Sequence, residues 1–288
     1  IMNVKLPLIL CFLYSATAFS QSPTTVNGLF VYQDSLKIPQ TYEIGPGQLT
    51  KNGSHFILGL MDGELDEYVN LVSDIYSIDL SATNPTETIK GFQLPNAPDS
   101  VRYFQCSASA NEDVLVYVSN LYAGWNDNEL AISYKQPDGS YGKHRVLKEL
   151  NDSLESDAYP WISADGLRIY YNRNFKMLYA ERKSWDEPFS KPVPVTFQGQ
   201  VNLEIVSAWF TDDELNMFIV ANNVIYRASR KSINEPFSFP EVFTNEFKNV
   251  YFIAGLSFMP DKKTLFLYYS TEDKQSILKY QLKKGKAW

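Results

Sequence analysis

Residues 156–195 read SDAYPWISADGLRIYYNRNFKMLYAERKSWDEPFSKPVPV. Two turn signals divide this stretch: Asp165-Gly166 separates PWIS from LRIYYN, and residues 172–176 lead into MLYAER. A proline-punctuated tail follows, so short apolar and aromatic runs alternate with turn residues. The pattern predicts one small antiparallel sheet of four short strands.

The chain repeats this unit. RKSWDEPFSKP at 182–192 returns as RKSINEPFSFP at 230–240, an offset of 48 residues (230 − 182). Looser copies share the turn residue, which we call the anchor, and the anchors are spaced 59, 54, 48 and 48 residues apart. Four-stranded repeats of this length are typical of β-propeller blades. We therefore predict an all-β fold, a single β-propeller of five four-stranded blades, with six as the alternative. The predicted anchor turns are Asn52-Gly53, Asn111-Glu112, Asp165-Gly166, Asp213-Glu214 and Asp261-Lys262.

The segment YPWISADGLRIYYNRN, followed by LYAERKSWDEPFSKPVPV, resembles the TolB-type, WD-like β-propeller repeat of bacterial envelope proteins. That repeat runs Pro, apolar residue, Ser, Pro, Asp, Gly, short strand, Asn-Arg and then a Leu-Tyr strand. Here Ala164 replaces the second Pro. The resemblance covers about four-fifths of the chain and is close in two blades. It implies a propeller fold but no single activity, since the family includes scaffolds, peptide binders and propellers attached to hydrolases.

The N-terminal residues 1–20 have the pattern of a cleaved secretory signal. Lys5 precedes an apolar run from Leu6 to Leu13, and Ala18-Phe19-Ser20 offers small residues before Gln21. Lipidation at Cys11 is the less favoured alternative, because Leu10 stands where lipidation signals usually carry a small residue. We therefore expect a periplasmic or extracellular protein.

Residues 21–288 are predicted to form one propeller domain. The last blade shows only three strand-like segments after Gly255, so a strand from the N-terminal segment is needed to complete the ring. GLFVYQD, from Gly28 to Asp34, is the candidate for this strand. Cys106 is the only cysteine left after cleavage, which excludes an intramolecular disulfide.

The charge pattern excludes some classes of partner. The formal net charge is −7, and no Lys/Arg cluster is dense enough for nucleic-acid binding. No run after the signal approaches the roughly 20 apolar residues of a membrane-spanning helix. We expect a monomer, with the basic C-terminal KKGKAW as a solvated tail.

Two long connections carry weaker signals. DGELDEYVNLVSD, at 62–74, holds four closely spaced carboxylates and Asn70, which could bind calcium, although a solvated acidic loop is favoured. NLYAGWNDNEL, at 120–130, places Trp125 in a polar setting, where it could stack on a sugar. A Trp that caps the edge of a blade is the favoured interpretation.

No catalytic constellation emerges from the sequence. His55 and His144 lack the neighbouring carboxylate, nucleophile or second ligand that acid-base or metal chemistry requires. Cys106 is expected to be a small buried hydrophobe. We predict no metal site and no cofactor.

Propeller ligands generally meet the central funnel, which the loops leading into the inner strands surround. The residues just before each anchor are therefore the predicted ligand-binding residues: Arg102, Tyr103, Asp157, Tyr159, Glu204 and Tyr251. Trp161 and Trp209 both lie four residues before an anchor. Because they occupy the same position in two repeats, packing between blades is the favoured role for this pair.

Two functions from different classes remain. The favoured one is an exported, non-catalytic propeller that binds a protein, peptide or carbohydrate through its funnel face. The alternative is a five-bladed glycoside hydrolase or lyase, in which Asp157 and Glu204 would serve as the carboxylate pair.

Overall fold

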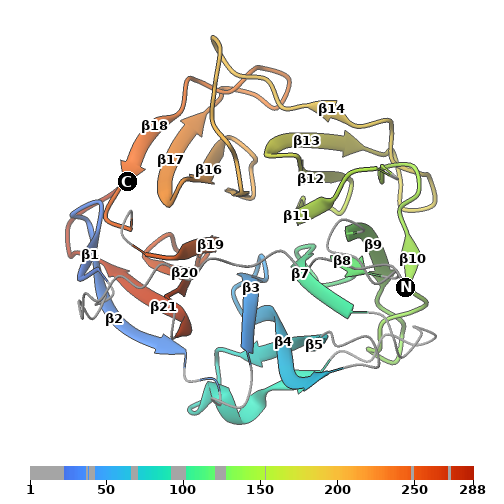
Figure 1. The fold of residues 1–288 in the computed structure, drawn as a ribbon, viewed down its shortest axis with the longest axis horizontal. Coiled ribbons are helices and arrows are strands. Elements are labelled where there is room, and N and C mark those ends of the chain that lie inside the picture. Colours follow the sequence, from blue (N-terminus) through green and yellow to red (C-terminus); the bar gives the residue numbers. More distant parts are fainter. Residues whose placement is uncertain are drawn as a thin grey trace, which may run out of the picture.

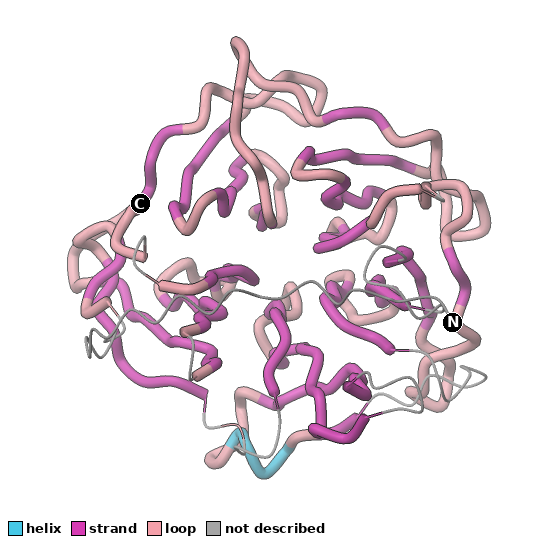
Figure 2. The backbone as a smooth tube through the Cα atoms, in the orientation of Figure 1, coloured by secondary structure: helices cyan, strands magenta, loops and turns pink. Residues whose placement is uncertain are grey.

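The computed structural model describes residues 23–36, 38, 43–65, 71–91, 102–120, 128–152, 154–247, 250–271 and 274–288. These residues form five antiparallel sheets arranged as blades in a ring (Figure 1). The described secondary structure is otherwise a single short 3-10 helix, η1 (Pro85–Thr88; Figure 2). The predicted five-bladed propeller is confirmed. The predicted signal at 1–20, with Cys11, lies outside the described residues.

Each blade runs from an inner strand at the centre to a short outer strand at the rim. Blade 1 contains β3 (Glu43–Leu49), β4 (His55–Leu65), β5 (Leu71–Asp79) and β6 (Lys90–Gly91). Blade 2 contains β7 (Arg102–Ala108), β8 (Val114–Asn120), β9 (Asn128–Tyr134) and β10 (Arg145–Val146). Blade 3 contains β11 (Asp157–Ile162), β12 (Arg168–Arg173), β13 (Lys176–Glu181) and β14 (Val193–Pro194). Blade 4 contains β15 (Ser207–Phe210), β16 (Asn216–Ala221), β17 (Val224–Ser229) and β18 (Glu241–Thr244). Blade 5 contains β19 (Phe252–Phe258), β20 (Thr264–Ser270), β21 (Gln275–Leu282), β2 (Phe30–Leu36) and β1 (Thr25–Val26).

The five anchors occupy the same turn in every blade. In each, the residue after the anchor donates its N–H to the carbonyl three residues earlier, at 2.7 to 3.0 Å. That residue has φ between 56 and 73°, which suits glycine and explains Gly53 and Gly166. In four blades a hydroxyl two residues before the anchor accepts the first N–H of the next strand, as Ser163 does from Arg168 at 2.8 Å. The repeated letters of the sequence are therefore the hydrogen-bonding groups of one turn.

The duplicated RKS motif has one structural role in both copies. Arg182 donates to the carbonyl of Gly166 at 2.8 Å, and Arg230 donates to the carbonyl of Glu214 at 2.9 Å. Each guanidinium also lies over a Phe of its own motif, 4.6 Å from the ring centroid of Phe189 in the first copy. The motif therefore ties the rim of its blade to the anchor turn through an arginine that is both hydrogen-bonded and stacked.

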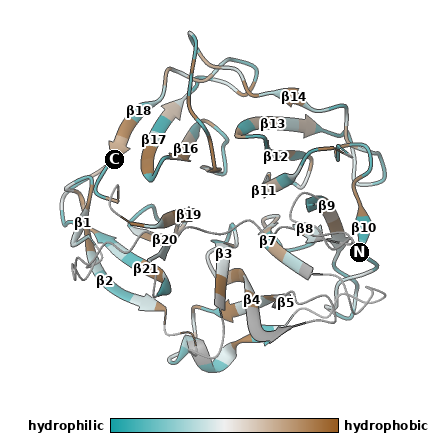
Figure 3. Ribbon diagram, in the orientation of Figure 1, coloured by the Kyte–Doolittle hydropathy of each residue, from teal (hydrophilic) through white to brown (hydrophobic). Residues whose placement is uncertain are grey.

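Hydrophobic residues lie mainly on the strands (Figure 3), and their buried side chains form a cluster that joins neighbouring blades. Trp161 is fully buried, with its ring centroid 5.0 Å from that of Phe210 in the next blade. Trp209 repeats the contact one blade further on, 5.2 Å from Phe258. The favoured role of the two tryptophans, packing between blades, matches these contacts.

The ring closes through the N-terminal strand, as predicted. Strand β2 pairs with β21 from Phe30↔Leu282 to Leu36↔Ile277, and the two lie side by side in Figure 1. Val26 and Phe30 are fully buried. The strand begins two residues later than the predicted Gly28 and ends two residues later than Asp34, and a short strand, β1, continues the sheet outward. Both ends of the described chain therefore belong to one blade.

The prediction of a solvated C-terminal tail agrees with the exposure of residues 283–287 but is wrong for Trp288. Trp288 stacks on Phe258 with the ring centroids 4.4 Å apart, and it meets Phe218 edge to face at 5.1 Å. Its indole N–H donates to the carbonyl of Lys262 at 2.8 Å, and the Arg227 guanidinium lies 5.4 Å from its ring. Charge alone had suggested solvation, but the one aromatic residue finds an aromatic surface between blades 4 and 5.

Replacing Trp288 by Ala is therefore expected to destabilise the protein by about 2 kcal/mol, from the lost burial, ring contacts and hydrogen bond. For a chain of this size that corresponds to a fall of roughly 5 °C in melting temperature, measurable by circular dichroism. Lys284→Ala, in the exposed part of the same tail, is the matched control. Equal melting of the two variants would show that the tail does not contribute.

The acidic connection at 62–74 is shorter than the sequence suggested. Strands β4 and β5 continue into it as far as the pair Leu65↔Leu71, so most of this segment extends a hairpin. Alternating apolar and acidic residues had concealed the strand pattern. The side chains of 61–74, and the loop that holds Trp125, lie outside the described residues, so neither the calcium nor the sugar-stacking hypothesis is tested.

Candidate functional site

The ring has two faces with different loops. We call the end at which the chain enters each inner strand the entrance face. The opposite end, where the anchor turns lie, is the turn face. Because neighbouring strands are antiparallel, the loop between the second and third strands of a blade returns to the entrance face. The six predicted site residues belong to the inner strands or to the segments leading into them, near the entrance face.

Asp157 is the predicted carboxylate that the structure explains most fully. It is completely buried, and its two oxygens accept hydrogen bonds from Arg173 Nε and Nη2 at 2.7 and 2.8 Å. The backbone N–H of Asp152 donates to it as well, at 3.1 Å. Burial raises the pKa of the Asp157 carboxyl, and the Arg173 hydrogen bonds oppose that shift. This carboxylate locks the start of β11 to the end of β12.

Two predicted tyrosines lie inside the protein. Tyr103 is buried, with its ring 5.5 Å from Tyr117 and 5.7 Å from His144. Tyr159 sits at an irregularity of β11, with φ of 52°, and its N–H donates to the Gln105 side chain at 2.8 Å. Burial raises the pKa of Tyr159. The Tyr103 ring therefore belongs to the buried interior, and the Tyr159 ring lines the centre of the propeller.

Glu204 and Tyr251 are exposed, Tyr251 to 74%. For Arg102 the structure describes the backbone but not the side chain. No hydrogen bond or ion pair joins any two of Asp157, Tyr159, Glu204 and Tyr251, all of which belong to the described chain. The predicted residues therefore lie near one face of the ring, but those whose side chains are described do not form one cluster.

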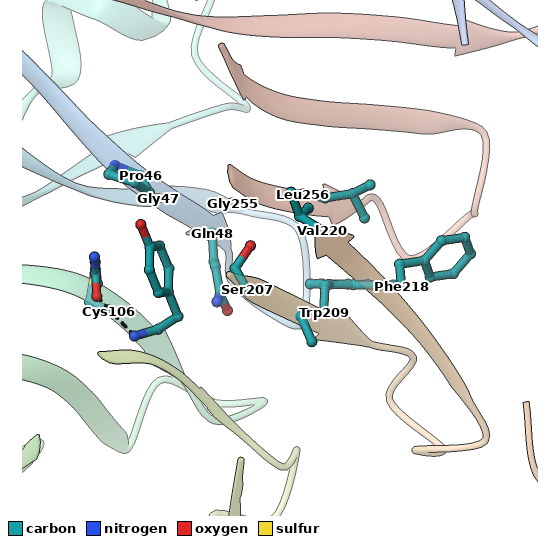
Figure 4. Close-up of a pocket in the computed structure, with 13 residues that line it drawn as sticks. Pro46, Gly47, Gln48, Cys106, Ser207, Trp209, Phe218, Val220, Gly255 and Leu256 are labelled. Atoms are coloured by element: carbon teal, nitrogen blue, oxygen red, sulfur yellow. Dashed lines mark hydrogen bonds between the residues drawn. The ribbon is translucent and has the colours of Figure 1, made fainter. Parts of the chain in front are cut away.

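The centre of the ring is filled by residues six positions before the anchors. These are Pro46, Gln105, Tyr159, Ser207 and Gly255, one from each blade. The space that they line with their neighbours is about 10 Å³, room for about one water molecule (Figure 4). The residues that line this space include no Asp or Glu. The inner strands thus leave little space between these residues.

A larger cavity, of about 220 Å³, opens toward the turn face between blades 1, 4 and 5. Trp209, Phe258, Met259 and Pro260 supply much of its apolar wall. Its charged lining comes from the anchor turns: Lys51, Asp212, Asp213 and Lys262. This cavity is larger than the space at the centre of the ring, and it is lined by ionisable side chains.

Lys51 is the unusual group in this cavity. It is only 9% exposed, and its ammonium nitrogen lies 3.4 Å from the ring centroid of Trp161. Since Lys51 belongs to blade 1 and Trp161 to blade 3, the lysine reaches across the centre of the ring. Burial lowers the pKa of Lys51 to about 7, although the charges of Asp212 and Glu214 oppose the shift. Burial also raises the pKa of the Asp212 carboxyl.

The sequence analysis missed this cavity, although a signal was present. The position directly before the anchor holds Ala or Pro in three blades, but Lys51 in blade 1 and Asp212 in blade 4. A charged residue at a repeat position that is otherwise apolar indicates that this position has a different role in that blade.

The contacts and burial of His55, His144 and Cys106 indicate structural roles for these three side chains. His55 Nδ1 lies 2.9 Å from both Glu112 Oε1 and Ser54 Oγ, so acid and hydroxyl share one ring nitrogen, unlike a catalytic triad. His144 Nδ1 pairs with the Tyr117 hydroxyl at 2.9 Å, and burial lowers its pKa. Cys106 is 1% exposed, and burial raises the pKa of its thiol.

The described residues contain neither a metal-binding cluster nor a membrane-spanning helix. Within them, no group of three or more His, Cys, Asp or Glu side chains is placed to hold a metal ion. None of the helices in this part of the chain is long and apolar enough to cross a membrane.

Comparison with known proteins adds information on the fold alone. The sequence matches no protein-family model and no curated protein. Among solved structures, TolB from Acinetobacter baumannii is similar with a TM-score of 0.52 and 13% identity, over 84% of this chain and 55% of TolB. A luciferin-regenerating enzyme is similar with a TM-score of 0.51 and 10% identity, over 85% of this chain and 92% of that protein. The Malassezia sympodialis allergen Mala s 1 has a TM-score of 0.50 and 10% identity, over 87% of this chain and 83% of the allergen. At these identities the likeness establishes a propeller and leaves the activity open.

Proposed function

We propose that the chain is an exported, non-catalytic propeller of the TolB type that binds a partner protein through its entrance face. The observation that carries this proposal is the exposure of three large apolar side chains there. Leu154 is 88% exposed, Tyr251 74% and Phe175 55%. Exposed apolar side chains gathered on one face are typical of interaction surfaces.

The chain path places all three residues on the same face. Leu154 lies three residues before β11, and Tyr251 directly before β19. Phe175 belongs to the turn between β12 and β13, and its carbonyl accepts the N–H of Ile205, just before β15, at 3.0 Å. The three residues thus border the entrances of blades 3, 4 and 5.

Charged groups lie beside these apolar residues. Arg173 is 3.8 Å from Asp152 and 3.9 Å from Glu155, whose side chains are 42% and 39% exposed. In protein interfaces, a few central residues commonly contribute most of the binding energy, and a polar rim around them excludes water. This arrangement favours a protein or peptide over a carbohydrate, because two of the three exposed side chains, Leu154 and Phe175, carry no polar group.

The hydrolase alternative receives less support. The residues that line the centre include no carboxylate, Asp157 is held by Arg173, and Glu204 is exposed. Glycoside hydrolysis needs two carboxyl groups about 5 to 9 Å apart, one of them free to exchange a proton. The signal-like segment at 1–20 and the TolB-type repeat support export to the periplasm or the exterior.

The proposal is tested with a triple variant, Leu154→Ser, Phe175→Ser and Tyr251→Ser. Partners are captured from an envelope fraction of the native organism, identified, purified and titrated against wild type and variant. We expect the triple variant to lose at least about tenfold in affinity, since truncating one central residue of an interface can cost more than about 1 kcal/mol of binding free energy. Its melting temperature should stay close to that of wild type.

The matched control is a double variant, Ile233→Ser and Val242→Ser, which removes side chains that are 43% and 58% exposed away from the entrance face. It should bind like wild type. Unchanged affinity of the triple variant would contradict the proposed face. Sugar release from a polysaccharide panel that Glu204→Gln abolishes would favour the hydrolase, and binding to a glycan array alone would make the partner a carbohydrate.

A further inference from the structure

The cavity at the turn face holds a lysine with few of the partners that a buried ammonium group normally has. Within the described chain, Lys51 makes no side-chain hydrogen bond and no ion pair; its recorded contact is with the Trp161 ring. A buried ammonium usually has its three N–H groups paired. Lys51 also helps to line the cavity of about 220 Å³.

Burial favours the neutral amine of Lys51, while the face of the Trp161 ring favours its cation. Trp209 belongs to the apolar wall of the cavity that Lys51 lines. The charged groups that face Lys51 are Asp212 and Glu214, and Lys262 and Asp213 line the same cavity. The pKa of about 7 agrees with this picture, because burial outweighs the two carboxylates. At neutral pH a large share of such a lysine carries a free electron pair.

Asp212 supplies a group that can relay protons. Burial raises its pKa, and Asp212 lines the same cavity as Lys51. Ionisable groups with shifted pKa values that share one cavity are candidates for a functional site. Surface lysines such as Lys284 lack both the apolar wall and the acid.

We propose that Lys51 is a reactive amine that binds small aldehydes or ketones as a reversible imine in this cavity. The nitrogen electron pair attacks the carbonyl carbon, and the Asp212 carboxylate carries one proton from the nitrogen to the carbonyl oxygen, which gives a carbinolamine. The nitrogen electron pair then forms the C=N bond as the C–O bond breaks, and Asp212 carries the second nitrogen proton to the departing hydroxyl group, which leaves as water. No oxidant or reductant is needed, and hydrolysis reverses the step.

The cavity restricts the ligand class. A volume of about 220 Å³ is below that of typical drug-sized pockets, so it accepts a carbonyl compound no larger than a substituted benzaldehyde. The Trp209 and Phe258 walls favour an apolar or aromatic body. This site lies on the opposite face from the proposed partner surface, so the two proposals stand or fall separately.

The test is reductive trapping with benzaldehyde and cyanoborohydride on the whole folded protein, near pH 7.5. Peptide mapping of the wild-type protein then ranks every lysine by its rate of benzylation. We expect Lys51 to be modified at least about tenfold faster than the exposed lysines, because the free amine is the nucleophile and a lysine in a model peptide, with a pKa near 10.4, is a free amine for only about a thousandth of the time at this pH. The rate at Lys51 should level off above its pKa while the others continue to rise.

Three variants sharpen the result. Lys51→Arg keeps the cation over Trp161 and should lose the fast adduct, while Lys262→Arg should keep it. Asp212→Asn should slow trapping at Lys51 and leave the other lysines unchanged. If Lys51→Arg fails to fold, the wild-type ranking and its pH profile decide alone. Trapping that follows exposure, with Lys51 among the slowest lysines, would overturn the proposal, as would a fast adduct that persists in folded Lys51→Arg.

Discussion

Deleting residues 24–36 is expected to open the ring and to abolish most of the monomeric protein. This deletion removes β2, leaves β21 without its neighbour over the pairs from Phe30↔Leu282 to Leu36↔Ile277, and takes away two fully buried side chains. Loss of Val26 and Phe30 alone costs about 5 kcal/mol, comparable with the total stability of many domains. The exposed edge of β21 then offers itself to other chains.

The measurement is size-exclusion chromatography with thermal unfolding. We expect oligomers and a melting temperature lower by at least about 10 °C. A synthetic peptide of residues 23–36, added in excess, should pair with β21 and restore the monomer. Gln33→Ala, an exposed position of the same strand, is the control and should change little. A monomer with unchanged melting after the deletion would show that β2 does not hold the ring together.

Asp157→Ala is expected to have the second largest effect, a loss of about 3 kcal/mol of stability. It leaves the Arg173 guanidinium, 14% exposed, without the carboxylate that holds two of its nitrogens. Breaking a buried ion pair from one side commonly costs 3 to 5 kcal/mol, and Asp152 and Glu155 nearby place this case at the low end. Chemical denaturation measures the loss.

A double variant separates the ion pair from the position. Asp157→Ala with Arg173→Met should recover much of the lost stability, because no uncompensated charge remains. Glu155→Gln, which removes one exposed partner at 3.9 Å, should change stability by less than about 0.5 kcal/mol. If the double variant were as unstable as Asp157→Ala, the loss would come from packing and not from charge. Loss of an activity in Asp157→Asn would accordingly not identify a catalytic group.

The blade count was predictable from the sequence because the anchor turn is local. Asp165 and Gly166 carry the hydrogen bonds and the positive φ of that turn within a few residues, so the same letters return wherever the turn returns. The closing strand was predictable for a related reason, since a blade of three strands leaves an edge that a ring must cover.

The candidate sites were less predictable because they join residues that are distant in sequence. Lys51 meets Trp161 across the centre of the ring, more than a hundred residues along the chain, and no local pattern contains that contact. Counting outward from the turn at Asp165-Gly166 also misses the pairing of Asp157 with Arg173 by one residue, because the irregularity between Ala158 and Trp161 shifts the register. For Trp288, a single aromatic in a basic tail offers no periodicity to interpret.

The pairing of β2 with β21 also determines how the molecule responds to force. Phe30, at the start of β2, lies opposite Leu282, at the end of β21, and the two-residue strand β1 folds back beside β2. Once β1 and the C-terminal tail are pulled free, tension on both sides acts at the corner formed by Phe30 and Leu282. Tension applied between the two ends loads the first pair of hydrogen bonds before the next and peels the strands apart one pair at a time. Strands pulled in shear would share the load. The joint that holds the ring firmly against heat is therefore the one that mechanical pulling on the chain ends would open first.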